Sequence, residues 1–439
     1  MVRSTARALL WIVLYLFMIF APLLIILIGP RPAGREFWRD FSVALGFVGL
    51  SMMGLQFLPT ARLPFLCCVF PMDALYFLHH AISMASLAFV LAHPLILVLG
   101  NPNFLDLFNP ITSPWRALSG VLALLAAFLL VASSVLRKNL RFVYEPWRLM
   151  HMLLSIAAAG LALIHITRVN YYTAMPLQRL LWLVLPVLWL GFILYARALK
   201  PALMLRKPYE LKEVRMERCD SWTLALAPLG HPGLEFHAGQ FAWLAVQKSP
   251  FDLRQHPFSF ASSAERKGWL EFTIRELGDF TRTVKDVPPG ARLYVDGPYG
   301  TFSPDFHDAP GYVLLAGGVG ITPIMSMLRT LADRGDKRPL ILFFGSFSWE
   351  TVVYREEIAE LEKGLNLKVV HVLEHPHEAW TGETGYITSD VLDRHLPSDR
   401  GSYYYFMSGP LPMIRSVEGA LKRAGVPLSR LQSERYEMA

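Results

Sequence analysis

Two stretches of the chain, HHAISMASLAFVLAH from His79 to His93 and HMLLSIAAAGLALIH from His151 to His165, place histidines inside apolar runs that are long enough to cross a bilayer. In each stretch the first and last histidines are 14 residues apart. Fourteen residues of α-helix turn through about 1400°, roughly 40° short of four turns, so both rings of a stretch share one helix face about 21 Å apart. The two matched helices therefore predict two sites, each with one imidazole from each helix.

A pair of imidazoles at membrane depth is best explained by haem. Six-coordinate haem iron needs two axial ligands, and the porphyrin supplies the other four. Tetrahedral zinc would need further cysteine or carboxylate ligands, and the sequence has none at these depths. His80 lies 13 residues before His93, which turns its ring about 140° away from that face, so it is not expected to be a ligand. The alternative is four core histidines bonded to hydroxyls or carbonyls, each costly if left unbonded.

The composition indicates a membrane half joined to a soluble half. In a chain of 439 residues, 53% are hydrophobic and only 18% are charged, which is too apolar for an ordinary soluble protein. Nearly all long apolar runs lie before Lys200. The net charge of +7 comes from basic residues beside these runs and not from a dense stripe, so we expect a lipid bilayer and no nucleic acid as partner. Cys67, Cys68 and Cys219 have no metal-ligand spacing and are expected to be structural.

Six apolar runs are long enough to span, and the first is expected to be a retained helix and not a signal peptide. Six crossings place both termini on one side. Assigning that side to the cytoplasm puts nine flanking basic residues inside and six outside, the bias expected for a cell (inner) membrane protein. His79 and His151 then lie toward the cytoplasm, and His93 and His165 toward the outside. The predicted spans are residues 8–29, 41–58, 73–99, 114–136, 147–167 and 177–199.

The soluble half contains two patterns. Short alternating stretches such as SWTLALAP and WLEFTIREL, separated by Gly/Pro turns, predict a small antiparallel β-barrel. From Gly311 onward, strands alternate with helical stretches, which predicts a parallel, doubly wound α/β sheet. The loop GGVGITP follows the strand GYVLLA and precedes a helix, so Gly317, Gly318 and Gly320 form a plausible seat for a dinucleotide pyrophosphate.

Five motifs support a family assignment: HPFSF at 256–260, GDFT at 278–281, DGPYG at 296–300, GGVGITP at 317–323 and SGPLPM at 408–413. In this order they resemble the ferredoxin reductase type of flavin dehydrogenase. The histidine helices before them, with LYFLHH and YEPWRLMH, resemble the NADPH oxidase and ferric reductase family. The resemblance covers the chain from about residue 40 onward. It implies a six-helix transmembrane di-haem bundle (1–200), an FAD-binding antiparallel β-barrel (205–308) and an NAD(P)-binding α/β doubly wound domain (309–439).

The same resemblance implies a role for individual residues. His79, His93, His151 and His165 would be the axial ligands of two b-type haems. The expected FAD residues are His256, Pro257, Phe258, Ser259, Arg275, Gly278, Phe280 and Thr281. The expected nicotinamide dinucleotide residues are Gly317, Gly318, Gly320, Thr322, Pro323, Ser408, Gly409, Pro410 and Met413. Ser259, Ser408 and the near-terminal Tyr436 would act where flavin and nicotinamide react, with Tyr436 against the flavin.

Two departures from the family pattern bear on the chemistry. Ser408 stands where the family usually has a cysteine, which is expected to slow hydride transfer. In GSFSWE, Phe347 and Glu350 stand where NADPH-preferring relatives tend to have an arginine. A carboxylate suits a ribose hydroxyl better than a 2′-phosphate, so the sequence favours NADH over NADPH.

The expected function is transmembrane electron transfer from cytoplasmic NAD(P)H through FAD, the inner haem and the outer haem. The acceptor outside would be oxygen, giving superoxide, or a ferric chelate, with a quinone or a periplasmic protein as further options. Two alternatives stay open. One is a haem-binding sensor or carrier, and the other is a membrane-anchored flavin reductase without transmembrane transfer.

Overall fold

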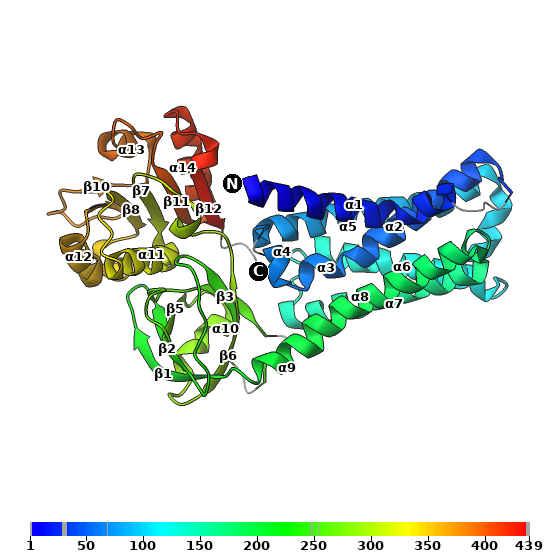
Figure 1. Ribbon diagram of the computed structural model, residues 1–439, viewed down its shortest axis with the longest axis horizontal. Coiled ribbons are helices and arrows are strands. Elements are labelled where there is room, and N and C mark those ends of the chain that lie inside the picture. Colours follow the sequence, from blue (N-terminus) through cyan, green and yellow to red (C-terminus); the bar gives the residue numbers. More distant parts are fainter. Residues whose placement is uncertain (1, 29–32, 68, 247–248, 253, 436–439) are drawn as a thin grey trace. The chain divides into compact units, whose positions relative to one another are not determined.

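The computed structural model describes residues 2–28, 33–67, 69–246, 249–252 and 254–435. The chain divides into two compact units, one helical (Met1–Lys200) and one that contains the β-strands (Pro201–Ala439) (Figure 1).

Among the described residues of the helical unit, six helices are long and apolar enough to cross a membrane, and each overlaps one predicted span. Their ends follow local rules: α8 begins with a proline at its first position, and α7 is followed by Asn170, which adopts a left-handed conformation (φ 48°). The long helices are α1 (Val2–Ile28), α2 (Phe37–Leu55), α5 (Met72–Gly100), α6 (Trp115–Val135), α7 (Tyr144–Val169) and α8 (Pro176–Leu194). Shorter helical segments connect or follow them: α3 (Phe57–Thr60), α4 (Pro64–Cys67), η1 (Pro102–Phe108), η2 (Tyr172–Ala174), η3 (Tyr195–Leu199) and α9 (Lys200–Met204).

The long helices pack in pairs through small residues. Helix α6 packs along α7, with Ala127 and Ala158 buried between them, and α2 packs along α5, where Ser86 donates a hydrogen bond to the Gly49 carbonyl (2.8 Å). By contrast, the backbones of α5 and α7, the two histidine helices, hardly approach each other. The two histidine helices therefore face each other through side chains, the paired histidine rings among them, and not through close backbones.

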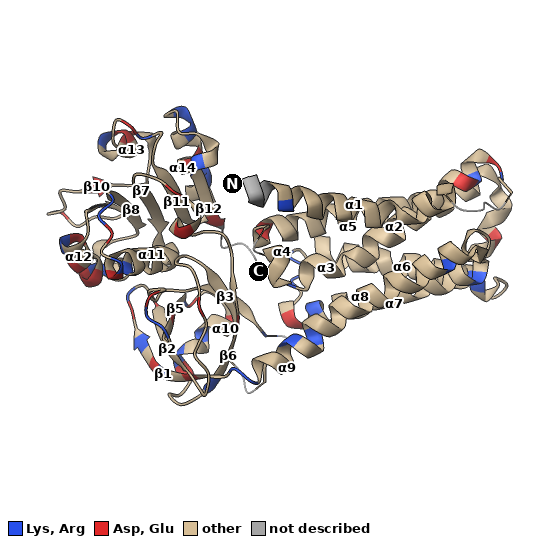
Figure 2. Cartoon of the chain, in the orientation of Figure 1, with Lys and Arg blue, Asp and Glu red and all other residues tan. Residues whose placement is uncertain are grey.

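Charged residues of this unit lie near the two ends of its helices, and the middle is almost free of them (Figure 2). Exposed apolar side chains cover the outside of the helices, among them Leu14, Phe128 and Leu183. This distribution suits a surface in contact with lipid, and the protein is a multi-pass membrane protein.

The first sheet of the second unit is antiparallel, in the strand order β4-β3-β6-β1-β2-β5. The expected barrel is not closed: in the described part of the chain, the edge strand β5 is linked to the end of β4 by a single isolated bridge, between Phe260 and Phe272. Pro257 lies in β4 and has no N–H to donate, which suits β4 to an edge. The strands are β1 (Tyr209–Met216), β2 (Ser221–Pro228), β3 (Phe241–Ala245), β4 (His256–Ser259), β5 (Leu270–Arg275) and β6 (Arg292–Tyr299), and the short helix α10 (Asp279–Arg282) follows β5.

The second sheet has the order β10-β9-β8-β7-β11-β12, and all its strand pairs are parallel. Helices α11 and α12 cover one face over a core that includes Leu314 and Phe344, and α13 and α14 lie against the other face over Val313 and Phe343. The doubly wound prediction is therefore confirmed. The strands are β7 (Tyr312–Gly317), β8 (Leu340–Ser346), β9 (Leu367–Leu373), β10 (Glu383–Thr384), β11 (Tyr404–Gly409) and β12 (Leu431–Arg435); the helices are α11 (Ile321–Asp333), α12 (Arg355–Gly364), α13 (Ser389–His395) and α14 (Leu411–Arg423).

Candidate functional site

The four histidines form two pairs at two depths of the helical unit. His79 and His151 each lie seven residues after the start of their helices, α5 and α7, and His93 and His165 each lie 21 residues after it. The ring centres of His79 and His151 are 6.3 Å apart, and those of His93 and His165 are also 6.3 Å apart. His80 is exposed. The helices thus bring together the rings that the 14-residue spacing predicts.

This spacing fits an ion held between each pair of rings. An imidazole nitrogen lies about 2 Å from a metal that it coordinates and about 1.2 Å from its ring centre, so rings on opposite sides of one ion are centred about 6 Å apart. No group of three or more His, Cys, Asp or Glu side chains suited to a metal occurs among the described residues. Each pair therefore supplies two ligands only, which fits a haem whose porphyrin supplies the rest.

Hydrogen bonds hold three of the four rings through Nδ1. His93 Nδ1 is 2.9 Å from the Ser42 carbonyl oxygen, His165 Nδ1 is 2.6 Å from the Arg116 carbonyl oxygen, and His151 Nδ1 is 3.0 Å from Ser134 Oγ. A ring that donates from Nδ1 keeps the lone pair of Nε2 for a metal, and the bond fixes its orientation. The two carbonyl partners, at Ser42 and Arg116, could not be found from the sequence, because a backbone carbonyl carries no residue signature.

The predicted flavin residues of HPFSF and GDFT come together at β4 and α10. The rings of His256 and Phe280 are stacked with centres 4.0 Å apart, and Phe258 stacks more distantly on the same Phe280 ring (6.2 Å). Thr281 Oγ1 accepts hydrogen bonds from the backbone N–H groups of Leu277 (2.8 Å) and Gly278 (2.9 Å). Pro257 lies within β4, opposite Trp243 on β3. The two motifs, separated in the sequence, thus form one aromatic cluster beside a tight turn.

The predicted dinucleotide loop lies at the carboxyl end of β7, next to that of β11. A Cβ atom on Gly320 would lie 2.3 Å from the Ser408 carbonyl oxygen, and one on Gly317 would lie 2.6 Å from Met413 Sδ and 3.0 Å from Pro410 Cδ. Only glycine permits these approaches. The structure therefore brings GGVG and SGPLPM together, as a shared nicotinamide site requires.

Further residues of these motifs adjoin the same loop. Gly318 has a positive φ of 53°, and a Cβ atom there would be 3.8 Å from the Arg275 guanidinium, so Arg275 lies beside the dinucleotide loop as well as near GDFT. Gly409 contacts Gly317 closely, since its Cβ would lie 3.1 Å from the Gly317 nitrogen. Thr322 donates a hydrogen bond to the Val319 carbonyl (2.9 Å) and, with Pro323, is buried at the start of α11.

Glu434 is a site residue that the sequence reasoning missed. Ser259 Oγ donates a hydrogen bond to Glu434 Oε2 (3.2 Å), and Glu434 lies opposite Ser408 in the pairing of β12 with β11. One carboxylate on β12 thus lies next to the residues expected at the flavin and at the nicotinamide. The signal in the sequence is the stretch SERYEMA, which contains Glu434 next to the predicted Tyr436. Tyr436 itself lies outside the described residues.

Past the end of β8, the residues expected to set the nucleotide preference are exposed or bonded locally. The Phe347 side chain is 57% exposed, and its ring centre is 4.4 Å from that of His375. The hydrogen bond from Ser348 (2.7 Å) lowers the pKa of Glu350, which is therefore a carboxylate at neutral pH. Arg355 is engaged elsewhere, because it bonds the Trp349 carbonyl and Glu356.

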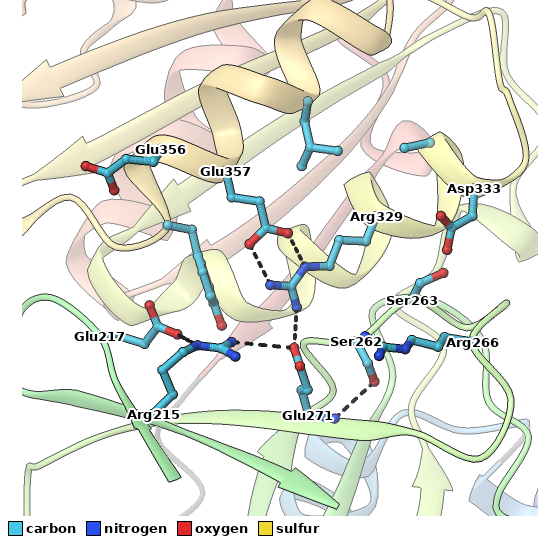
Figure 3. A pocket seen from close by; sticks show the side chains of 13 residues that line it. Arg215, Glu217, Ser262, Ser263, Arg266, Glu271, Arg329, Asp333, Glu356 and Glu357 are labelled. Carbon is cyan, nitrogen blue, oxygen red and sulfur yellow. Dashed lines mark hydrogen bonds and ion pairs between the residues drawn. The ribbon is translucent and has the colours of Figure 1, made fainter. Parts of the chain in front are cut away.

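A pocket of about 600 Å³ lies between the first sheet and helices α11 and α12 (Figure 3). The described residues that line it include none of the predicted site residues. At its centre, Arg329 on α11 binds Glu357 on α12 through two bonds (2.6 and 2.7 Å) and Glu271 on β5 (2.8 Å). Burial alone would lower the pKa of Arg329, but the bonds to Glu357 and the nearby acidic charges raise it above its ordinary value. The pocket is thus built around an ion-pair network that joins the first sheet to helices α11 and α12, which cover the second sheet.

Profiles of three protein families match successive parts of the chain. One described as ferric reductase like transmembrane component matches residues 45–162, one described as FAD-binding domain matches residues 209–303, and one described as oxidoreductase NAD-binding domain matches residues 314–419. Together they have the architecture of ferric reductases and NADPH oxidases.

Individual relatives match only part of the chain. NADH-cytochrome b5 reductase 1 of Cryptococcus neoformans (strain JEC21) is 32% identical over 180 residues, which are 38% of this chain and 61% of the relative. The reductase component of propane 2-monooxygenase of Rhodococcus jostii (strain RHA1) is 30% identical over 227 residues, 49% of this chain and 60% of the relative. The chain thus spans about three fifths of both. A solved structure, the ferredoxin reductase in carbazole 1,9a-dioxygenase, is 26% identical with a TM-score of 0.46, over 52% of this chain and 69% of that one.

Proposed function

The chain has the three-part architecture of the ferric reductase and NADPH oxidase family, and on that premise we propose that it transfers electrons from NADH through FAD and two haems across a membrane. The acceptor is oxygen or a ferric chelate on the far side. The dehydrogenase unit faces the cytoplasm, where the nicotinamide pool is, in agreement with the nine-to-six bias of basic residues.

The observation that carries this proposal is the pair of 6.3 Å ring separations at two depths of one helix pair. One such pair would anchor a single cofactor at one face. Two pairs in the same two helices, roughly 21 Å apart along them, provide positions at both faces, which is what passage of an electron through a bilayer requires. A sensor or carrier would need only one of them.

In the second unit, the proposal assigns each cluster a task. A bound flavin supplies the conversion between a two-electron hydride donor and one-electron acceptors. The aromatic rings of His256, Phe258 and Phe280 provide a surface for a planar ring, and Arg275 provides positive charge for phosphates. The closely approaching glycines at Gly317 and Gly320 let a dinucleotide reach the backbone N–H groups at the start of α11.

Glu434 and Ser259 are proposed to position the reacting rings. The hydrogen bond between them links β12 of the second sheet to β4 of the first sheet, and Glu434 lies opposite Ser408 on β11. Such a link keeps the nicotinamide site and the flavin site in one relative position, which hydride transfer between them needs.

NADH is the proposed donor. The carboxylate of Glu350 and the exposed ring of Phe347 occupy the segment after β8, and Arg355 there is already engaged with Trp349 and Glu356. A carboxylate suits the ribose hydroxyls and disfavours a 2′-phosphate. A relative that the chain matches is named for NADH as well.

The test is the haem content of the full-length protein purified in detergent. We expect two low-spin haems per chain, and His79→Ala should remove one of them while NADH still reduces the flavin. His80→Ala is the matched control, since the exposed His80 should leave both haems in place. A parent protein with a single haem, or full haem content in His79→Ala, would contradict the ligand assignment.

A further inference from the structure

The outer histidine pair, His93 and His165, makes the same unusual contact twice. Each ring bonds through Nδ1 to a backbone carbonyl inside a neighbouring helix, His93 to Ser42 of α2 (2.9 Å) and His165 to Arg116 of α6 (2.6 Å). A carbonyl inside a helix already accepts the N–H four residues later, so the ring must approach it from the side.

The residue four positions after each of these carbonyls is a glycine. Ser42 is followed by Gly46, and Arg116 by Gly120. A Cβ atom on Gly120 would lie 2.7 Å from His165 Nδ1 and 3.0 Å from its Cε1, which is closer than atoms can pack. A Cβ atom on Gly46 would lie 3.4 Å from His93 Cγ and 3.5 Å from its Nδ1, an ordinary contact. The His165 ring therefore requires that Gly120 has no side chain, whereas the His93 ring leaves room for an alanine, but not a larger residue, at position 46.

The inner pair is held without such a space. His151 bonds the hydroxyl of Ser134, which in turn donates to the Leu130 carbonyl (2.7 Å). His79 Nδ1 is buried beside the Gln56 backbone carbonyl, but the contact does not meet hydrogen-bond geometry. For the glycines of the described residues, neither the His79 ring nor the His151 ring is among the three atoms nearest to an added Cβ. The glycine contact thus distinguishes the outer level from the inner one.

We propose that Gly120 is a positioning residue for the outer haem, and that Gly46 has the same role with more tolerance. By leaving the side of a helix carbonyl open, Gly120 lets His165 donate from Nδ1, which aims Nε2 of His165 at the space shared with His93. This rests on the proposed function, because it takes the space between the rings to be a haem site. Glycine inside a helix is less favourable than alanine, so these glycines are not explained by helix stability.

The experiment compares three glycine-to-alanine variants of the full-length protein in detergent. Gly120→Ala should push the His165 ring off its carbonyl, so that one low-spin haem is lost or becomes high-spin and the low-spin haem signal falls by about half. Gly46→Ala should keep both low-spin haems. Gly160→Ala, on α7 with nothing within 4 Å of its Cβ position, controls for a methyl group added to the histidine helix itself.

The readouts are haem per protein and the low-spin electron paramagnetic resonance signals, neither of which depends on turnover. All three changes replace glycine by the better helix former alanine, so misfolding of Gly120→Ala alone would itself reflect the clash with His165. In that case a second comparison tests the same idea at His93: Gly46→Val should disturb the outer haem, whereas Gly46→Ala should not. Two unaltered low-spin signals in Gly120→Ala would overturn the inference and leave the proposed function standing. A parent protein without haem would overturn both.

Discussion

Replacing Arg329 by methionine should destabilise the strand-containing unit, Pro201–Ala439, by about 3 kcal/mol. The Arg329 side chain is 14% exposed and lies between Glu271 (9% exposed) and Glu357 (40% exposed). Removing one partner of a buried ion pair costs about 3–5 kcal/mol, because the remaining charge stays out of water. We take the lower end, since Glu357 can turn to solvent and Glu271 keeps a hydrogen bond from Trp269 Nε1 (3.1 Å) and a distant contact with Arg215 (3.9 Å).

The assay is thermal unfolding of the full-length protein in detergent, followed by the fluorescence of released flavin, which reports on the flavin-carrying unit. For a unit of this size, 3 kcal/mol corresponds to a midpoint lower by about 6–12 °C. The matched control is Lys363→Met on α12, because the ion pair of Lys363 with Glu360 is exposed (71% and 72%) and should contribute almost nothing. Equal midpoints for Arg329→Met and Lys363→Met would refute the assignment of Arg329 as the link between the two sheets.

Three further predictions concern the second unit. Phe347→Arg should raise the ratio of NADPH to NADH use by about tenfold or more, because it adds a cation where a 2′-phosphate would lie. The control is Phe251→Arg, which changes a similarly exposed phenylalanine (48%) between β3 and β4 and should leave the ratio as it is. An unchanged ratio of kcat/KM values in Phe347→Arg would contradict the preference site. Burial, with a smaller effect of the Arg355 charge, lowers the pKa of His371 to about 4, so its folded form resists protonation and stability should fall as pH drops from about 6.5 toward 4. His371→Asn should lose less stability over that window, and parallel curves for parent and variant would refute it. Ser408→Cys should speed flavin reduction by NADH in stopped flow, and a slower rate would show that the serine is suited to this pocket.

The features that could be predicted from sequence are those set by periodicity. The 14-residue spacing, combined with about 100° per residue, was enough to pair His79 with His151 and His93 with His165, because helix geometry varies little. The order of strands and helices after Gly311 was likewise enough for the parallel sheet. The glycines of GGVG could be predicted to let another group approach the backbone closely. The sequence did not show that β11 and the loop after it would be one of those groups.

Other features depend on contacts that no local pattern records. The open first sheet follows from how short β4 is and from the single bridge at Phe260, which are tertiary outcomes. The Arg329 network joins residues 58 and 28 positions apart in sequence, and an isolated arginine has many alternative partners. Glu434 gains its place at the site only through its contact with Ser259, 175 residues away in the sequence. Gly46 and Gly120 have meaning only once the histidine rings are placed beside them.

The central claim, that electrons cross the membrane through this chain, is tested most directly in sealed proteoliposomes whose protein has its dehydrogenase unit outside. External NADH should reduce ferric citrate trapped in the lumen, and each electron that enters should make the lumen more negative. His165→Ala should abolish reduction in the lumen while NADH still reduces the flavin. Reduction confined to acceptors on the NADH side would contradict the account and favour a membrane-anchored flavin reductase.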